Sequence, residues 1–101
     1  MKRQHISDRN RFSIIQNEEE FKHYCLVCGM PATDIHECFQ GRNRQKSKDY
    51  GLCISLCRKH HDEAHKNPVL RREIEQMGKH AFLEYWGDIE QFKEVFGRYY
   101  E

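Results

Sequence analysis

The stretch Leu56-Cys-Arg-Lys-His-His-Asp-Glu-Ala-His65 places one cysteine and three histidines within ten residues. Its first two ligands form a Cys57-x-x-His60 pair, and a Cys25-x-x-Cys28 pair precedes it by 28 intervening residues. Each pair can point two ligand atoms at one centre, and two such pairs complete the tetrahedron that structural zinc prefers. The spacing therefore predicts a structural Zn²⁺ bound by Cys25, Cys28, Cys57 and His60.

The five cysteines include two that fall outside these pairs. Cys53 lies four residues before Cys57 and offers an alternative to the Cys-x-x-His pair. In a strand over residues 52–56, however, Cys53 alternates with apolar neighbours as an ordinary strand residue. We therefore interpret Cys53 and Cys38 as packing residues. The odd number of cysteines also favours metal binding over a disulfide framework.

Three histidines remain as a second set of ligands. His61 and His65 are one helical turn apart, so both imidazoles project from the same face of a helix. His36 adds a third ligand if its strand lies beside that helix. Three protein ligands with open positions are typical of a catalytic metal site, whereas four close a structural one. The alternative is a helix with solvated histidines, and the adjoining zinc ligands favour the metal site over it.

The composition predicts a small soluble domain with a thin core. The chain has 101 residues, of which 38% are hydrophobic and 33% charged, and its mean hydropathy is −0.98. No apolar run approaches the roughly 18 residues of a membrane span, and no secretory signal follows Met1. We therefore expect a cytoplasmic protein with no membrane partner. A chain of this length is marginally stable by burial alone, which favours a metal as an additional constraint.

The residue pattern between the ligands predicts two strands and a helix. Residues 33–39 favour a strand with His36 on one face and Glu37 on the other. Residues 52–56 predict a second strand, and residues 58–66 a helix. The polar stretch 40–49 between the strands predicts an exposed loop.

The C-terminal third predicts helices with a structural role. Apolar residues recur at spacings of three and four from Leu70 to Tyr85, which indicates one helix from about Pro68 to Trp86, with Asn67 as its N-cap. Gly78 lies within this stripe and offers an alternative in which the helix splits in two. Asp88 and Gln91 form a capping-box pattern for a final helix. Near the N-terminus, residues 12–16 favour a short strand.

Charge is strongly segregated along a chain whose net charge is only +1. Residues 39–60 contain six Lys or Arg residues against one Asp. This local excess predicts one contact face for an anionic partner. The alternative is a solvated charged surface. The position of the predicted loop between the two strands that carry candidate site residues favours DNA as this partner, and the residues that would contact its backbone phosphates are Arg42, Arg44, Lys46 and Lys48.

The order of these features resembles the HNH endonuclease family, over about residues 24–67. Within that family the chain resembles small HNH-like proteins encoded by phages and prophages, which would place it in a bacterial host cell. The resemblance implies an α+β chain with a zinc-bound, treble-clef-like ββα-metal core followed by C-terminal helices. It also implies a DNA endonuclease in which His36, His61 and His65 bind one catalytic divalent ion such as Mg²⁺, Mn²⁺ or Ni²⁺.

Two positions depart from the family pattern. Many members carry a second histidine directly after the strand histidine, where it activates water, and Glu37 occupies that position here. A carboxylate can accept a proton from water, so we predict His36 and Glu37 as catalytic residues and Asp34 as an orienting partner of a ligand imidazole. The family's asparagine has no counterpart near Gly51, and Asn43 lies earlier in the chain.

These departures keep alternative functions open. The first is a catalytically degenerate zinc module that binds DNA or a protein partner, and another is an inhibitor or adaptor that uses residues 68–101. We divide the single domain into an N-terminal arm (1–20, partly ordered), the HNH-like core (21–67) and a helical extension (68–101). The C-terminal aromatic residues either complete the core or support a homodimer.

Overall fold

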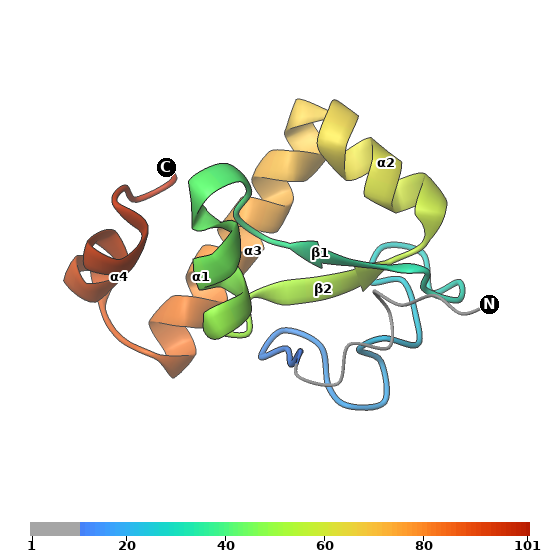
Figure 1. The fold of residues 1–101 in the computed structure, drawn as a ribbon, viewed down its shortest axis with the longest axis horizontal. Coiled ribbons are helices and arrows are strands. Elements are labelled where there is room, and N and C mark those ends of the chain that lie inside the picture. The colour runs from blue at the N-terminus through green and yellow to red at the C-terminus, as the bar shows by residue number, and fades with distance from the viewer. Residues whose placement is uncertain (1–10) are drawn as a thin grey trace.

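The structure is a computed structural model that describes residues 11–101, so the first half of the predicted N-terminal arm lies outside the described residues. The elements in chain order are β1 (Asp34–Glu37), the 3₁₀ turn η2 (Gly41–Asn43), α1 (Arg44–Asp49), β2 (Cys53–Leu56), α2 (Arg58–Lys66), α3 (Pro68–Tyr85) and α4 (Ile89–Phe96). In this part of the chain they form the α+β arrangement of one two-stranded sheet and four α-helices (Figure 1).

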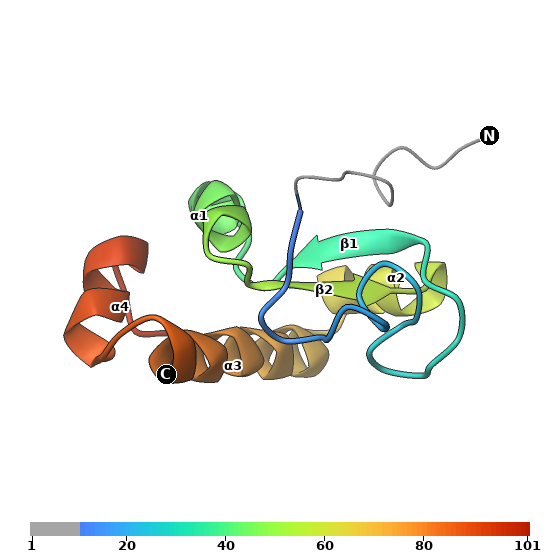
Figure 2. The same cartoon turned by 90° about the horizontal axis from the view of Figure 1, so that it is seen from below.

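The two strands pair antiparallel, with His36 opposite Ile54 and Glu37 opposite Cys53. Because side chains alternate along a strand, the pairing assigns these two pairs to opposite faces of the sheet. Helices α2 and α3 lie on the His36 side, and the segment 11–24 runs along the other side (Figures 1 and 2). The sheet is therefore covered on both faces, and all eight strand residues are buried.

The segment before the first cysteine pair covers the free edge of β2 without forming a strand. Ser13 Oγ donates to the carbonyl of Cys53 at 2.7 Å, and the Ser55 amide donates to Gln16 Oε1 at 2.7 Å. The strand predicted for residues 12–16 is wrong, because the Ser13 hydroxyl also accepts from the amides of Ile15 and Gln16 and turns the chain there. Side chains satisfy the strand edge that a third strand would otherwise occupy.

The predicted exposed loop 40–49 is also wrong, because this stretch forms η2 and α1. Its buried positions are polar, so they carry no apolar signal. Ser47 is fully buried and its hydroxyl bonds the carbonyls of Phe39 and Asn43 at 3.1 and 3.0 Å. Asn43 is 4% exposed and donates to the carbonyl of Phe96 and the hydroxyl of Tyr100. Hydrogen bonds thus hold α1 against the core.

The C-terminal helices begin where the sequence predicted. Asn67 Oδ1 caps α3, and Asp88 with Gln91 forms the capping box of α4. Gly78 does not split α3, which runs without a break from Pro68 to Tyr85. A Cβ at this position would lie 2.7 Å from Cys38 Cβ. The glycine lets α3 approach the end of β1. The aromatic residues of α4 and the tail pack into this chain's own core, in which Phe92, Phe96 and Tyr100 are buried.

Candidate metal sites

The first candidate site joins the turn after residue 24 to the start of α2. One ligand atom from each of Cys25, Cys28, Cys57 and His60 lies within 4.8 Å of all the others. The Cys57 and His60 ligand atoms are 3.3 Å apart, Cys25 and His60 3.7 Å, and Cys28 and Cys57 3.8 Å. A tetrahedral zinc ion separates two thiolate sulfurs by about 3.8 Å and sulfur from nitrogen by about 3.6 Å. The observed spacings therefore fit one ion.

Local hydrogen bonds shape the first cysteine pair into a turn. The Cys25 amide donates to the Met30 carbonyl at 2.7 Å, and the Gly29 amide donates to the Cys25 carbonyl at 2.8 Å. Gly29 has a φ of 79°, which glycine adopts without a steric penalty. The Leu26 amide donates to Ser55 at 2.9 Å and ties the turn to β2. The second pair needs no loop, because Cys57 is the N-cap of α2 and His60 lies in its first turn.

The charge state of Cys25 favours metal binding. Burial raises the pKa of this thiol, but backbone hydrogen bonds from Cys57, Cys28 and Val27 outweigh it and lower the pKa to about 7. The thiolate is the form that binds a metal. Cys38 and Cys53 lie outside the ligand group, and burial raises the pKa of both thiols. The structure therefore does not bring Cys53 to Cys57 as a replacement pair.

The second candidate site lies between β1 and α2. Ligand atoms of His36, His61 and His65 lie within 4.8 Å of one another, and the Nε2 atoms of His61 and His65 are 3.3 Å apart. The ring of His36 meets those of His61 and His65 edge to face, with centroids 5.4 and 5.1 Å away. His36 is buried, His61 half-buried and His65 exposed, so the group opens from the sheet toward solvent.

His36 and His61 fit a metal ion in protonation as well as in position. Burial, followed by the neighbouring His61 and His65, lowers the pKa of His36 to about 4, and burial also lowers the pKa of His61. Neutral imidazole is the ligand form. Within residues 11–101, the buried Nδ1 atom of His36 has no hydrogen-bond partner. Buried polar atoms are normally paired, and a first-row transition metal suits such a set of imidazoles.

Asp34 lies beside this group, at the start of β1. Its Oδ2 is 3.6 Å from His61 Nδ1, and its Oδ1 is 3.3 Å from an Nη of Arg58. Thr33 Oγ1 donates to Oδ2 at 2.8 Å and fixes the carboxylate. A carboxylate at the far nitrogen of a ligand histidine is a common arrangement around protein-bound metals. The structure thus brings Asp34 to the ligand that it was predicted to orient.

Residues 5–92 match the sequence pattern of the HNHc_6 family, which is described as "Putative HNHc nuclease". The chain belongs to this HNH family. The match covers both groups of candidate ligands and most of the helical extension. Membership of this family therefore suggests a nuclease-like function.

One relative of this HNH protein is "Uncharacterized protein YdfU" of Escherichia coli (strain K12). The two are 43% identical over 47 residues, which is 45% of this chain and 14% of the relative. The chain thus spans a small part of the relative's length. No solved structure matches the HNH chain. Within residues 11–101, no helix is both long and apolar enough to cross a membrane.

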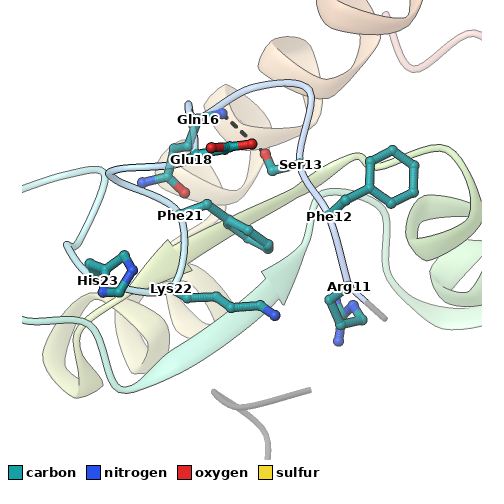
Figure 3. Close-up of a pocket in the computed structure, with 8 residues that line it drawn as sticks. All are labelled: Arg11, Phe12, Ser13, Gln16, Glu18, Phe21, Lys22 and His23. Carbon is teal, nitrogen blue, oxygen red and sulfur yellow. Dashed lines mark hydrogen bonds between the residues drawn. The ribbon is translucent and has the colours of Figure 1, made fainter. Parts of the chain in front are cut away.

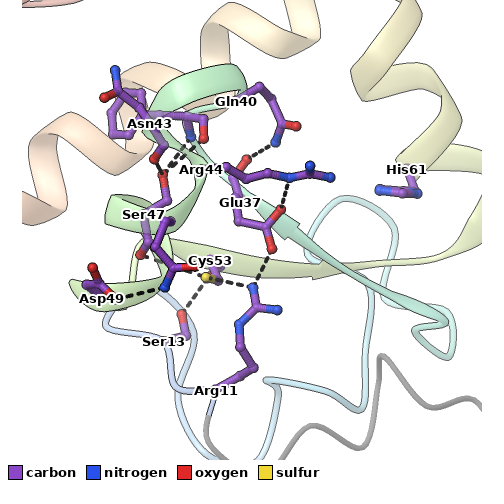
Figure 4. A network of polar contacts seen from close by, with 12 residues as sticks. Arg11, Ser13, Glu37, Gln40, Asn43, Arg44, Ser47, Asp49, Cys53 and His61 are labelled. Carbon is purple, nitrogen blue, oxygen red and sulfur yellow. Dashed lines mark hydrogen bonds and ion pairs between the residues drawn. The ribbon is translucent and has the colours of Figure 1, made fainter.

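The structure does not bring Glu37 into the three-histidine group. Its side chain leaves the opposite face of β1 and lies between two guanidinium groups (Figure 4). Arg11 Nη2 is 2.6 Å from Oε2, and Arg44 Nε is 3.3 Å from Oε1. Arg11 was missed by the sequence analysis, because it lies 26 residues from Glu37 with no motif around it.

The predicted DNA-binding residues lie on η2 and α1 rather than on a loop. Arg42, Arg44 and Lys46 are exposed and Lys48 is half-buried. Helix α1 lies at the end of the sheet where β1 leaves and β2 enters (Figure 1). From this position, Arg44 of α1 reaches Glu37 at the end of β1.

A separate cavity lies against the segment 11–23 (Figure 3). It contains none of the predicted metal ligands. Its lining residues are Arg11, Phe12, Ser13, Gln16, Glu18, Phe21, Lys22 and His23. The candidate chemistry therefore lies outside this cavity, at the open histidine group on the other side of the sheet.

Proposed function

We propose that this protein is a metal-dependent endonuclease that hydrolyses phosphodiester bonds of DNA. The observation that carries the proposal is the convergence of His36, His61 and His65, whose ligand atoms lie within 4.8 Å of one another, together with a buried His36 Nδ1 that has no hydrogen-bond partner among the described residues. Three ligands leave positions open for water and phosphate, whereas a purely structural site would be closed by protein.

Each ligand group has its own role in this proposal. Cys25, Cys28, Cys57 and His60 hold a structural Zn²⁺ that joins the first turn to α2. The three-histidine group holds a second divalent ion, which supplies charge stabilisation to the phosphate and to the departing 3′ oxygen. Imidazole ligands favour Ni²⁺ among the candidate ions, because Mg²⁺ and Mn²⁺ prefer oxygen ligands.

The surrounding residues position the substrate and the ligands. Asp34 orients the ring of His61 from 3.6 Å. The basic residues of η2 and α1 contact backbone phosphates of the DNA, so binding weakens steeply with salt. In the overall reaction water adds to the phosphorus, the bond to the 3′ oxygen breaks, and that oxygen takes up a proton.

Nicking of supercoiled plasmid tests this proposal. The zinc-loaded protein is assayed with added Ni²⁺, Mn²⁺ or Mg²⁺, next to the variants His61→Ala and His80→Ala. His80 is exposed on α3 and outside both ligand groups, so it is the matched control. We expect nicking by the wild type and the control, and none by His61→Ala with its zinc content unchanged.

Metal analysis, together with the nicking assay, can overturn the proposal. One zinc per chain, no second ion at any concentration and no nicking would overturn the proposal. The same protein would then be a zinc module that binds DNA or a protein partner without cleaving it.

A further inference from the structure

Glu37 is a buried carboxylate placed between two arginines of different character. Its side chain is 9% exposed, that of Arg11 10% and that of Arg44 59%. Arg11 approaches from the segment before the first cysteine pair and also donates to Cys53 Sγ at 3.1 Å. Arg11 is therefore a buried countercharge, while Arg44 reaches solvent.

This arrangement is unsuited to activating water. Both carboxylate oxygens of Glu37 already accept from guanidinium groups. To take a proton from water, the carboxylate would have to surrender an ion pair inside a buried site, which is costly. Its face of the sheet is also opposite that of His36, because consecutive strand residues alternate.

The same contacts aim the other end of Arg44 at the histidine site. Among the described residues, Arg44 contacts Glu37 through Nε, and its side chain is 59% exposed, so its two Nη groups can reach a ligand. In Figure 4 the guanidinium extends from Glu37 toward the side on which His61 lies, and the His61 ring points back toward it.

We propose that Glu37, pinned by Arg11, is a positioning residue that holds the guanidinium of Arg44 at the edge of the three-histidine group, where it binds the phosphate that is cleaved. This inference rests on the proposed nuclease function and names a residue for it. The three side chains together carry one net positive charge, which one phosphodiester neutralises. Arg44 thereby differs from Arg42 and Lys46, which contact phosphates elsewhere on the backbone.

The residue type at position 44 follows from this role. A guanidinium can give one donor to Glu37 and still present two others in a plane to phosphate oxygens. A lysine ammonium at the same place is a point charge that would pair with Glu37 and would not present a second, planar set of donors to the phosphate. The charge-preserving change Arg44→Lys therefore tests geometry rather than charge.

The first experiment compares Arg44→Lys with Lys46→Ala in steady-state nicking. We expect Arg44→Lys to lower kcat about 10²-fold or more, as loss of one preorganised donor to the reacting phosphate does. Lys46→Ala should raise KM and reduce the salt dependence while kcat changes by less than about threefold. Equal effects of the two variants, or an Arg44→Lys kcat within about threefold of the wild type, would overturn the inference.

A second variant separates positioning from proton transfer. The double change Arg11→Gln with Glu37→Gln removes one positive and one negative charge together, so no unpaired charge is buried. The side-chain amide oxygen introduced by Glu37→Gln can still accept from Arg44 Nε. We expect a loss of about tenfold or less with an unchanged pH–rate profile, whereas loss of a general base costs about 10²- to 10⁴-fold and alters that profile. The latter result would make Glu37 the base.

A readout independent of cleavage keeps both proposals distinguishable. In zinc-loaded, ¹⁵N-labelled protein without added second ion, a short DNA duplex should shift the Nε–H resonance of Arg44 and leave that of Arg11 in place. An unshifted Arg44 resonance beside shifted Arg42 and Lys46 signals would overturn the inference. Absence of nicking by the wild type alongside a shifted Arg44 would instead overturn the nuclease and retain Arg44 as a phosphate contact.

Discussion

The two ligand groups share helix α2 but differ in what they connect and in how they meet solvent. The group of Cys25, Cys28, Cys57 and His60 links segments far apart in the sequence and uses four protein ligands. The three-histidine group links β1 to α2, which already pack together, and grades from a buried to an exposed side chain. From this comparison we expect the first group to serve stability and the second to be surplus to it.

The largest effect is expected from Cys57→Ser. Serine is a good helix N-cap, so the start of α2 is preserved while one thiolate of the proposed zinc site is lost. Zinc contributes about 10 kcal/mol or more to the folding of small zinc domains. We expect circular dichroism to show no cooperative thermal transition and metal analysis to show loss of zinc. A variant that melts like the His80→Ala control would contradict the structural role.

The free energy of unfolding is expected to decrease at acidic pH because His36 is buried in its neutral form. Its pKa falls from 6.5 to about 4 in the folded state, first because of burial and then because of His61 and His65. Between these values the unfolded chain binds a proton that the folded chain does not. The free energy of unfolding therefore decreases as the pH falls from 6.5, by about 2 kcal/mol at pH 5.

Urea titrations at pH 7, 6 and 5 measure this dependence, with zinc content checked at each pH. His36→Gln cannot titrate, so its stability should fall less steeply over the same interval. Parallel curves for the two proteins would show that His36 is not held neutral by the fold.

A smaller effect is expected for Asp34→Asn. Loss of the carboxylate beside His61 should weaken divalent-ion binding at the three-histidine group about 10- to 100-fold. Calorimetric titration of the zinc-loaded protein with Ni²⁺ measures the affinity. Glu63→Gln, which removes an exposed carboxylate from α2, is the matched control and should bind like the wild type. Equal affinities of all three proteins would exclude a role for Asp34.

The smallest effect on stability is expected for His65→Ala. This side chain is exposed, and its carbonyl keeps the hydrogen bond from Arg71 after truncation. We expect the free energy of unfolding to change by less than about 0.5 kcal/mol while Ni²⁺ affinity falls. A loss above about 2 kcal/mol in urea denaturation would make the histidine group a structural element and remove its contrast with the four-ligand group.

Local spacing explains how much could be predicted. Helices α2, α3 and α4, both strands and the two caps follow from periodicity and from residues next to one another in sequence. The candidate ligands could be grouped for the same reason, since each pair lies within one turn. Helix α1 could not be predicted in this way, because its buried positions Asn43 and Ser47 are polar and form hydrogen bonds with residues up to 57 positions away.

By itself, the sequence determined which candidate ligands lie within one turn of each other, and that His36 and Glu37 leave β1 on opposite faces. Only the tertiary structure decided what each face meets. Helix α2 brings two histidines to His36, whereas the segment 11–24 brings Arg11 to Glu37. The physical reason is that pleat and helix period are local properties, while the partner of a buried carboxylate depends on which distant segment packs over it.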